Sequence, residues 1–125
     1  VNTLVDKIAA GFPEIAQPFE LGKSYLGHSI KGLALAAPSY AVFKDAPFEV
    51  EPNFNIKDEA QQRPSILIDG AHHARELTSV SQVMYTLLRL LHGYLNNDPQ
   101  VKRILGTSGM YFVPVVNYDG YDAIS

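Results

Sequence analysis

The chain has 125 residues, of which 46% are apolar, and its net charge is -3 at pH 7. This length and composition suit one globular domain with a sizeable core and exclude a disordered tail. The slightly acidic balance excludes a basic surface for nucleic acid, the absence of cysteine excludes disulfides and thiolate metal sites, and no apolar run reaches membrane-spanning length.

The first part of the chain predicts a helix followed by a β-hairpin. Thr3 can cap this helix, with Asp6 completing a pair that resembles a capping box. The apolar face of the helix is predicted to be Leu4, Ile8 and Phe12. Two strands follow, at Phe19–Tyr25 and Ser29–Ala36, and Gly27-His28 between them is typical of a hairpin turn.

The middle of the chain predicts a long excursion, a strand and a long helix. Ala37–Arg63 is rich in Pro, Asp, Glu and Asn, so we expect a surface excursion and not a linker between domains. Ile66–Ile68 predicts a short strand that is buried on both faces. Gly70 allows a sharp turn into a helix that begins after Glu76. The apolar residues of that helix recur at helical spacing: Leu77, Val80, Met84, Leu87, Leu88, Leu91 and Leu95.

The last part of the chain predicts a short helix and a final strand. Asp98 can cap the helix, and Gly106 is expected to end it. The strand is predicted at Met110–Asn117, where Pro114 removes a hydrogen-bond donor and favours a sheet edge or a bulge. The strand-helix-strand unit from Ser65 to Asn117 predicts two parallel strands, and the antiparallel hairpin makes the sheet mixed. The predicted fold class is therefore α/β, with helices packed on a mixed sheet.

The residues that suggest chemistry lie where the middle strand gives way to the long helix. His73 and Glu76 are three residues apart, so an imidazole and a carboxylate can lie on one side of a turn and reach one zinc ion. The carboxyl end of a strand is also where open α/β sheets place their sites. The pair alone is equally compatible with an ordinary helix start, in which Glu76 meets the first-turn dipole. His72 is expected to be a neighbour of the pair, and His28 and His92 are expected at the surface.

Three segments, in this order along the chain, carry a family pattern. Leu21–Lys31 reads LGKSYLGHSIK and is similar to a hairpin of the form IGxSxEGRxI. Asp69–Glu76 reads DGAHHARE and is similar to a zinc motif, GxHxRE. Val113–Tyr121 reads VPVVNYDGY and is similar to a turn, PxxNPDGY, with Tyr118 where proline is usual. Together these segments resemble the zinc metallocarboxypeptidases of the pancreatic carboxypeptidase A/B type.

The resemblance implies a fold, an activity and a set of site residues. Residues 1–125 would be the N-terminal, incomplete portion of a mixed-sheet α/β catalytic domain of about 300 residues, a size one domain can reach. The implied activity is zinc-dependent hydrolysis of the C-terminal peptide bond of peptides or proteins. His73 and Glu76 match the first two zinc ligands, and Arg75 matches a substrate-binding arginine. Three further residues match a turn that shapes the site and have no assigned catalytic role: Asn117, Asp119 and Gly120.

The resemblance also implies that this chain needs a partner. The family's third zinc ligand, general-base glutamate and oxyanion-stabilising arginine lie downstream of Ser125, so we expect no catalytic residue in this chain and no activity from the chain alone. We expect the partner to be the remaining part of its own domain or a second chain. Without it, four apolar side chains are expected to be exposed: Ile66, Ile68, Val113 and Val115.

Two other functions are left open by the sequence. The first is a non-catalytic carboxypeptidase-like module that serves in interaction or assembly. The second is a zinc amidohydrolase of the aspartoacylase-like branch, which shares the His-x-x-Glu start, although the hairpin and the Asn-x-Asp-Gly-Tyr turn favour the peptidases. The cellular location is unknown from the residues, and the resemblance implies a secreted or lysosomal one.

Overall fold

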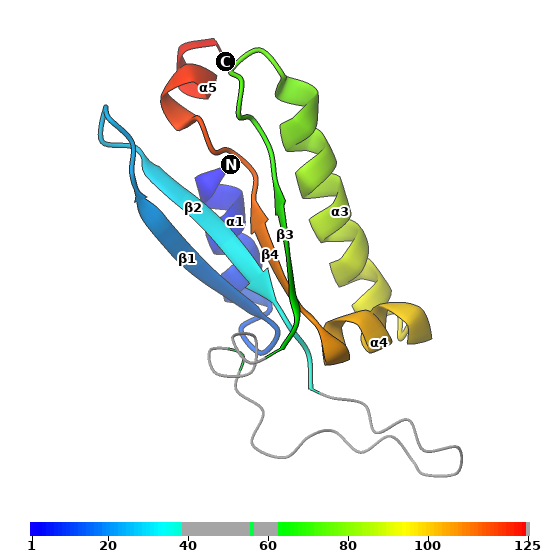
Figure 1. Ribbon diagram of the computed structural model, residues 1–125. Helices are drawn as coiled ribbons and strands as arrows, with labels where there is room; N and C mark the ends of the chain where they lie inside the picture. Colours follow the sequence, from blue (N-terminus) through cyan, green and yellow to red (C-terminus); the bar gives the residue numbers. More distant parts are fainter. Residues whose placement is uncertain (39–55, 57–62, 125) are drawn as a thin grey trace, which may run out of the picture.

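A computed structural model describes residues 1–38, 56 and 63–124 of the chain. Its centre is a four-stranded sheet in the order β1-β2-β4-β3 (Figure 1). The strands are β1 (Ala16–Lys23), β2 (Ser29–Leu35), β3 (Ser65–Asp69) and β4 (Gly109–Val113). β2 is antiparallel to both β1 and β4, whereas β3 runs parallel to β4. The predicted α/β class with a mixed sheet is therefore confirmed.

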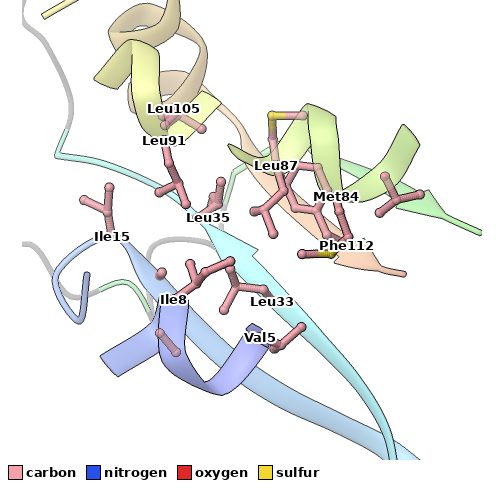
Figure 2. Close-up of a cluster of buried hydrophobic side chains, with 14 of the residues drawn as sticks. Val5, Ile8, Ile15, Leu33, Leu35, Met84, Leu87, Leu91, Leu105 and Phe112 are labelled. Atoms are coloured by element: carbon pink, nitrogen blue, oxygen red, sulfur yellow. The ribbon is translucent and has the colours of Figure 1, made fainter. Parts of the chain in front are cut away.

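Helices pack on one face of this sheet. They are α1 (Asn2–Gly11), α3 (Leu77–Leu95) and α4 (Pro99–Thr107), whereas α5 (Tyr118–Ile124) lies at the end of the sheet. In Figure 2, Val5 of α1 and Leu87 of α3 meet Leu33 and Phe112 of the sheet in a single buried cluster. Complete burial of a side chain of this size contributes roughly 1.5–3 kcal/mol. None of the helices in the described part of the chain combines the length and hydrophobicity that a membrane crossing requires.

Strand β3 differs from its prediction as a strand buried on both faces. In the described residues it pairs only with β4, at the edge of the sheet, and Ile66 and Leu67 are 52% and 60% exposed. The exposure expected for Ile66 is therefore confirmed, whereas Ile68 is partly buried against the core. The exposure expected for Val113 and Val115 is wrong, since each is only 2% exposed. Both belong to the chain at and after β4, the strand that has neighbours on both sides.

The start of α1 also differs from its prediction. The helix begins at Asn2, two residues before the start that a cap at Thr3 implies, with Val1 at the cap position and no side-chain hydrogen bond there. Asp6, predicted to complete a capping box, instead accepts a hydrogen bond of 2.7 Å from Lys31 of β2. This contact uses the side chain of Asp6 to tie the helix to the sheet.

The apolar stripes of the helices are narrower than predicted. Leu77, Leu88 and Leu95 of α3 are 39%, 45% and 56% exposed, and Leu4 of α1 is 42% exposed. On α1, Val5 faces the protein core at the place where Leu4 was predicted to do so. Apolar residues at helical spacing still spread around the helix axis, so only the central part of such a stripe faces the sheet.

Strand β4 ends at Val113, directly before Pro114. The prediction that Pro114 lies inside the strand, at a sheet edge or a bulge, is wrong, because β4 is central among the described strands and the proline follows its last residue. Beyond the strand, the chain continues beside the loop after β3: Gly70 donates its N–H to the carbonyl of Val113, and Val116 donates to that of Gly70. These bonds bring the two segments that form the candidate site to the same end of the sheet.

The helix α4 precedes β4 in the chain, and the helix α5 follows it. Asp98 caps α4 as predicted, because its Oδ1 accepts the N–H of Gln100 at 2.9 Å. The helix continues through Gly106, where an end was predicted, to Thr107. The helix α5 was not predicted at all, and Figure 1 places it at the end of the sheet beside the hairpin tip.

The long excursion predicted for Ala37–Arg63 lies almost wholly outside the described residues. At its far end, Arg63 donates Nη1 to the carbonyls of Ala37 and Leu105, at 2.7 and 2.8 Å. This guanidinium joins the two ends of the segment to the end of α4.

Candidate metal and substrate site

The loop between β3 and α3 has a fixed and unusual backbone. Ala71 has φ of 52°, in the left-handed region that favours glycine. Its N–H donates to Ser79 Oγ at 2.8 Å, and the Ser79 hydroxyl donates to the carbonyl of Glu76 at 2.6 Å. Gly70, expected to provide the turn, is instead needed for space, since a Cβ there would lie 3.0 Å from the carbonyl oxygens of Pro114 and Ser79.

This loop brings His73 and Glu76 together, as their spacing predicts. His73 Nδ1 and Glu76 Oε1 are 3.3 Å apart, and the two side chains are 76% and 58% exposed. Two ligands at ordinary zinc distances in a tetrahedral arrangement lie about 3.3–3.5 Å apart. The separation therefore suits two donors on one ion. Among the residues that the structure describes, no group of three metal-ligating side chains is present.

An open hollow of about 480 Å³ lies beside this pair. Its lining comes from the loop after β3 and from the segment that contains α5: His72, His73, Ala74, Arg75, Asn117 and Ile124. Arg75 is exposed, so its guanidinium is accessible to a bound molecule. A planar donor of this kind suits carboxylate or carbonyl oxygens.

Asn117 and Gly120 hold the two walls of the hollow together. Asn117 donates Nδ2 to the carbonyl of His72 at 3.3 Å and its backbone N–H to the carbonyl of Ala71 at 3.0 Å. Its Oδ1 accepts the N–H of Gly120 at 3.1 Å, so Asn117 also caps α5. A Cβ on Gly120 would lie 2.8 Å from that of Ala74. The family resemblance assigns these residues no catalytic role, and in the structure their contacts position the loop.

His72 is more than the neighbour that the sequence suggests. Its Nε2 lies 3.1 Å from Asp69 Oδ1, and the side chain lines the hollow. The signal for this contact was present in the sequence as the same three-residue spacing that pairs His73 with Glu76.

A second set of polar contacts fastens the β1–β2 hairpin to α5, and we call it the hairpin clamp: Ser24, Leu26, His28 and Asp119. Asp119 accepts hydrogen bonds from Ser24 Oγ at 2.5 Å, the N–H of Leu26 at 3.0 Å and His28 Nδ1 at 2.8 Å. The bond from His28 and then that from Ser24 hold the pKa of Asp119 below its ordinary value. Sequence reasoning placed His28 at the surface and missed this role, because its partner is far away in the chain.

Comparison with known proteins supports the family resemblance over the whole chain. The family model for zinc carboxypeptidases matches residues 1–125. Human carboxypeptidase D is 29% identical over 123 residues, which cover 97% of this chain and 9% of that protein. Carboxypeptidase B of Astacus astacus is 28% identical over 121 residues, or 97% of this chain and 32% of that protein.

The relatives differ in activity, and all are much longer than this chain. The inactive metallocarboxypeptidase ECM14 of Ajellomyces capsulatus is 29% identical over 114 residues, which cover 91% of this chain and 16% of that protein. The chain thus spans at most 32% of the length of these three relatives.

Solved structures share the fold. The crystal structure of thrombin activatable fibrinolysis inhibitor superposes with a TM-score of 0.72 at 19% identity, covering 98% of this chain and 25% of that one. Carboxypeptidase A from Helicoverpa armigera gives a TM-score of 0.66 at 22% identity, covering 97% of this chain and 24% of that one. From the family match over its entire length, the chain belongs to the zinc carboxypeptidase family.

Proposed function

We propose that this chain is a portion of a zinc-dependent carboxypeptidase that hydrolyses the C-terminal peptide bond of peptides or proteins. Residues 1–125 would form the N-terminal part of its catalytic domain. Family membership supports the reaction class. The observation that carries the proposal is the 3.3 Å approach of His73 Nδ1 and Glu76 Oε1 at the edge of a hollow that Arg75 also lines.

Each of these residues has a proposed role. His73 and Glu76 hold zinc, and the bonds of Ser79 to the loop keep the two side chains near each other before the metal arrives. Zinc, when bound, polarises a carbonyl and activates a water molecule. Arg75 binds a carbonyl or carboxylate oxygen of the substrate through its planar fork. The third ligand and the general base come from segments outside this chain.

Metal analysis tests the zinc site. We expect stoichiometric zinc in the complete protein and little zinc in residues 1–125 alone near neutral pH, because two ligands leave the coordination incomplete. Both forms are dialysed against a zinc buffer and measured by atomic emission. Tight zinc in the short form that survives His73→Ala would rule out this site.

We also propose that the remaining part of the domain, or a second chain, pairs with β3. The support is that, among the described residues, β3 has a neighbouring strand on one side only, and that Ile66 and Leu67 are exposed. Residues 1–125 alone should therefore self-associate in light scattering, and Leu67→Lys should reduce the association. Leu21→Lys, at an equally exposed leucine of β1, is the matched control. A monodisperse monomer, or a larger effect of the control, would contradict this proposal.

A non-catalytic interaction or assembly module is the second candidate. It is favoured by the inactive metallocarboxypeptidase among the relatives and by the two-ligand set in the described residues. The family match is to zinc carboxypeptidases, which disfavours the amidohydrolase branch. Incubating the zinc-loaded complete protein with peptides of varied C-terminal residues decides between the candidates. Release of the terminal amino acid supports the enzyme, and its absence from every peptide supports the module.

A further inference from the structure

His28, at the tip of the β1–β2 hairpin, lies between two carboxylates of α5. Its Nδ1 is 2.8 Å from Asp119 Oδ1, and its Nε2 is 3.5 Å from Asp122 Oδ2. The ring also stacks on that of Tyr118, with centroids 5.2 Å apart and planes inclined by 30°. The imidazole thus touches one helix through both nitrogens and one face.

The contact with Asp119 fixes which nitrogen of neutral His28 carries the proton. The lowered pKa of Asp119 keeps this carboxyl ionised near neutral pH, and an ionised carboxyl only accepts hydrogen bonds. Nδ1 must therefore be the donor. A neutral imidazole has a single N–H, so its Nε2 then presents a lone pair to the Asp122 carboxylate. Protonation places an N–H and a positive charge on this side and converts the contact into an attraction.

The other groups that face the ring do not change charge in the same range. Burial, and then the Asp122 carboxylate, raise the pKa of Tyr118, so the phenol stays neutral. Ser24, on the hairpin side, donates its hydroxyl to Asp119 and has no charge. Of the residues in this contact, only His28 is of a type that ordinarily titrates between pH 5 and 8.

The helix that His28 holds is also a wall of the hollow. Ile124 of α5 lines it, and Asn117, directly before α5, both lines it and donates to the carbonyl of His72. We infer that protonation of His28 controls the hairpin clamp. The protonated ring binds the hairpin more tightly to α5 and so steadies this wall of the hollow, whereas the neutral ring weakens the contact and lets the wall move. The inference does not depend on what the hollow binds.

Hydrogen exchange by mass spectrometry on the intact protein tests the clamp. Rates are measured at about pH 5.5 and about pH 8, on either side of the ordinary histidine value, and corrected for the intrinsic effect of pH. Exchange in residues 24–28 and 118–124 should be about two- to fivefold faster at the higher pH, the size expected for one partly exposed charge pair. The segment of β4 should show no such change.

Three variants separate the clamp from a general effect of pH. His28→Gln should remove the pH response of both segments, and Asp122→Asn should reduce it to the part that the attraction between protonated His28 and Asp119 supplies. His92→Gln is the control, since this exposed histidine contacts Asn96 at the far end of α3, and it should respond like the parent protein. Exchange in β4 reports whether each variant is folded. An equal rate at both pH values in the parent, or an unchanged response in Asp122→Asn, would overturn the inference.

Nitrogen NMR of protein labelled with ¹⁵N-histidine provides an independent readout that does not require a variant to fold. At high pH the neutral ring of His28 should carry its proton on Nδ1. A neutral ring protonated on Nε2 would overturn the inference, because Nε2 would then already donate toward Asp122 without a change of charge.

Discussion

Two histidine–carboxylate pairs in this chain have the same chemistry and opposite surroundings. In the hairpin clamp, His28 and Asp119 are 2.8 Å apart, and the carboxylate accepts two further donors from the hairpin. In the loop after β3, His73 and Glu76 are 3.3 Å apart and largely exposed. A carboxylate that neighbouring donors already satisfy stabilises the fold. A carboxylate with accessible lone pairs beside a hollow is suited to receive a ligand.

The largest expected difference between the pairs concerns metal. In the complete protein, His73→Ala should lower zinc affinity by about a hundredfold or more, because even partners outside the coordination shell are worth about 10–100-fold. The unfolding midpoint of the metal-free protein should barely change, since the side chain is 76% exposed. Competition titration with a chelating dye measures the affinity, and calorimetry in a chelator measures the midpoint.

His28→Ala is the matched variant for that experiment. It should leave zinc affinity unchanged and lower the unfolding midpoint. The variant removes one of the three hydrogen bonds to Asp119 and weakens the arrangement of the other two, from Ser24 and Leu26. If both variants lost zinc to the same extent, the distinction between a ligand-binding pair and a structural pair would be wrong.

A smaller effect is expected from the cation beside the exposed pair. Arg75→Ala in the complete protein should lower kcat/KM on peptides by roughly ten- to a hundredfold, the equivalent of about 1.5–3 kcal/mol for one charged hydrogen bond. Zinc content should not change. Arg89→Ala removes another exposed arginine, on α3 and outside the hollow, and should have no kinetic effect. Unchanged kinetics in Arg75→Ala would assign Arg75 to the solvated surface.

The smallest expected effect is on stability at acidic pH, and it tests the pair of His28 and Asp119. The pKa of Asp119 is lowered in the folded chain, so its contribution to stability is present above the ordinary carboxyl value of about 3.9 and is lost as pH falls through the lowered pKa. The unfolding midpoint of the parent protein should therefore fall more steeply between about pH 4 and about pH 2 than that of Asp119→Asn. Parallel curves would show that the carboxylate is no better satisfied in the fold than in the unfolded chain.

The difference between the two pairs also explains what the sequence could predict. His73 and Glu76 are three residues apart, so a local turn suffices to bring them together, and the same is true of the Asp98 cap. His28 and Asp119 are separated by 91 positions, and no local pattern describes their contact. Even so, one signal for α5 was available: Asn117 followed by an acidic residue is typical of a helix start.

Other differences between prediction and structure arise because a local sequence pattern assumes packing partners that the described residues do not always supply. The apolar run at Ile66–Ile68 is typical of a strand with neighbours on both sides, and the described residues supply a neighbour on one side only. Turn residues were similarly misassigned within the loop, where the left-handed backbone belongs to Ala71 while Gly70 provides room. In both cases the composition of the segment was interpreted correctly, but its packing partners decide which residue has which role.

The bare backbone of Gly120 limits how this family member can vary. The Cβ of Ala74 would lie 2.8 Å from any Cβ at this position, and alanine has no rotamer with which to move away, so the two walls of the hollow meet here at a fixed spacing. A larger residue at 120 would push α5 away from the loop that carries His73. Related chains should therefore vary the lining of the hollow at other positions, such as 72 or 124, while the spacing of the walls stays constant.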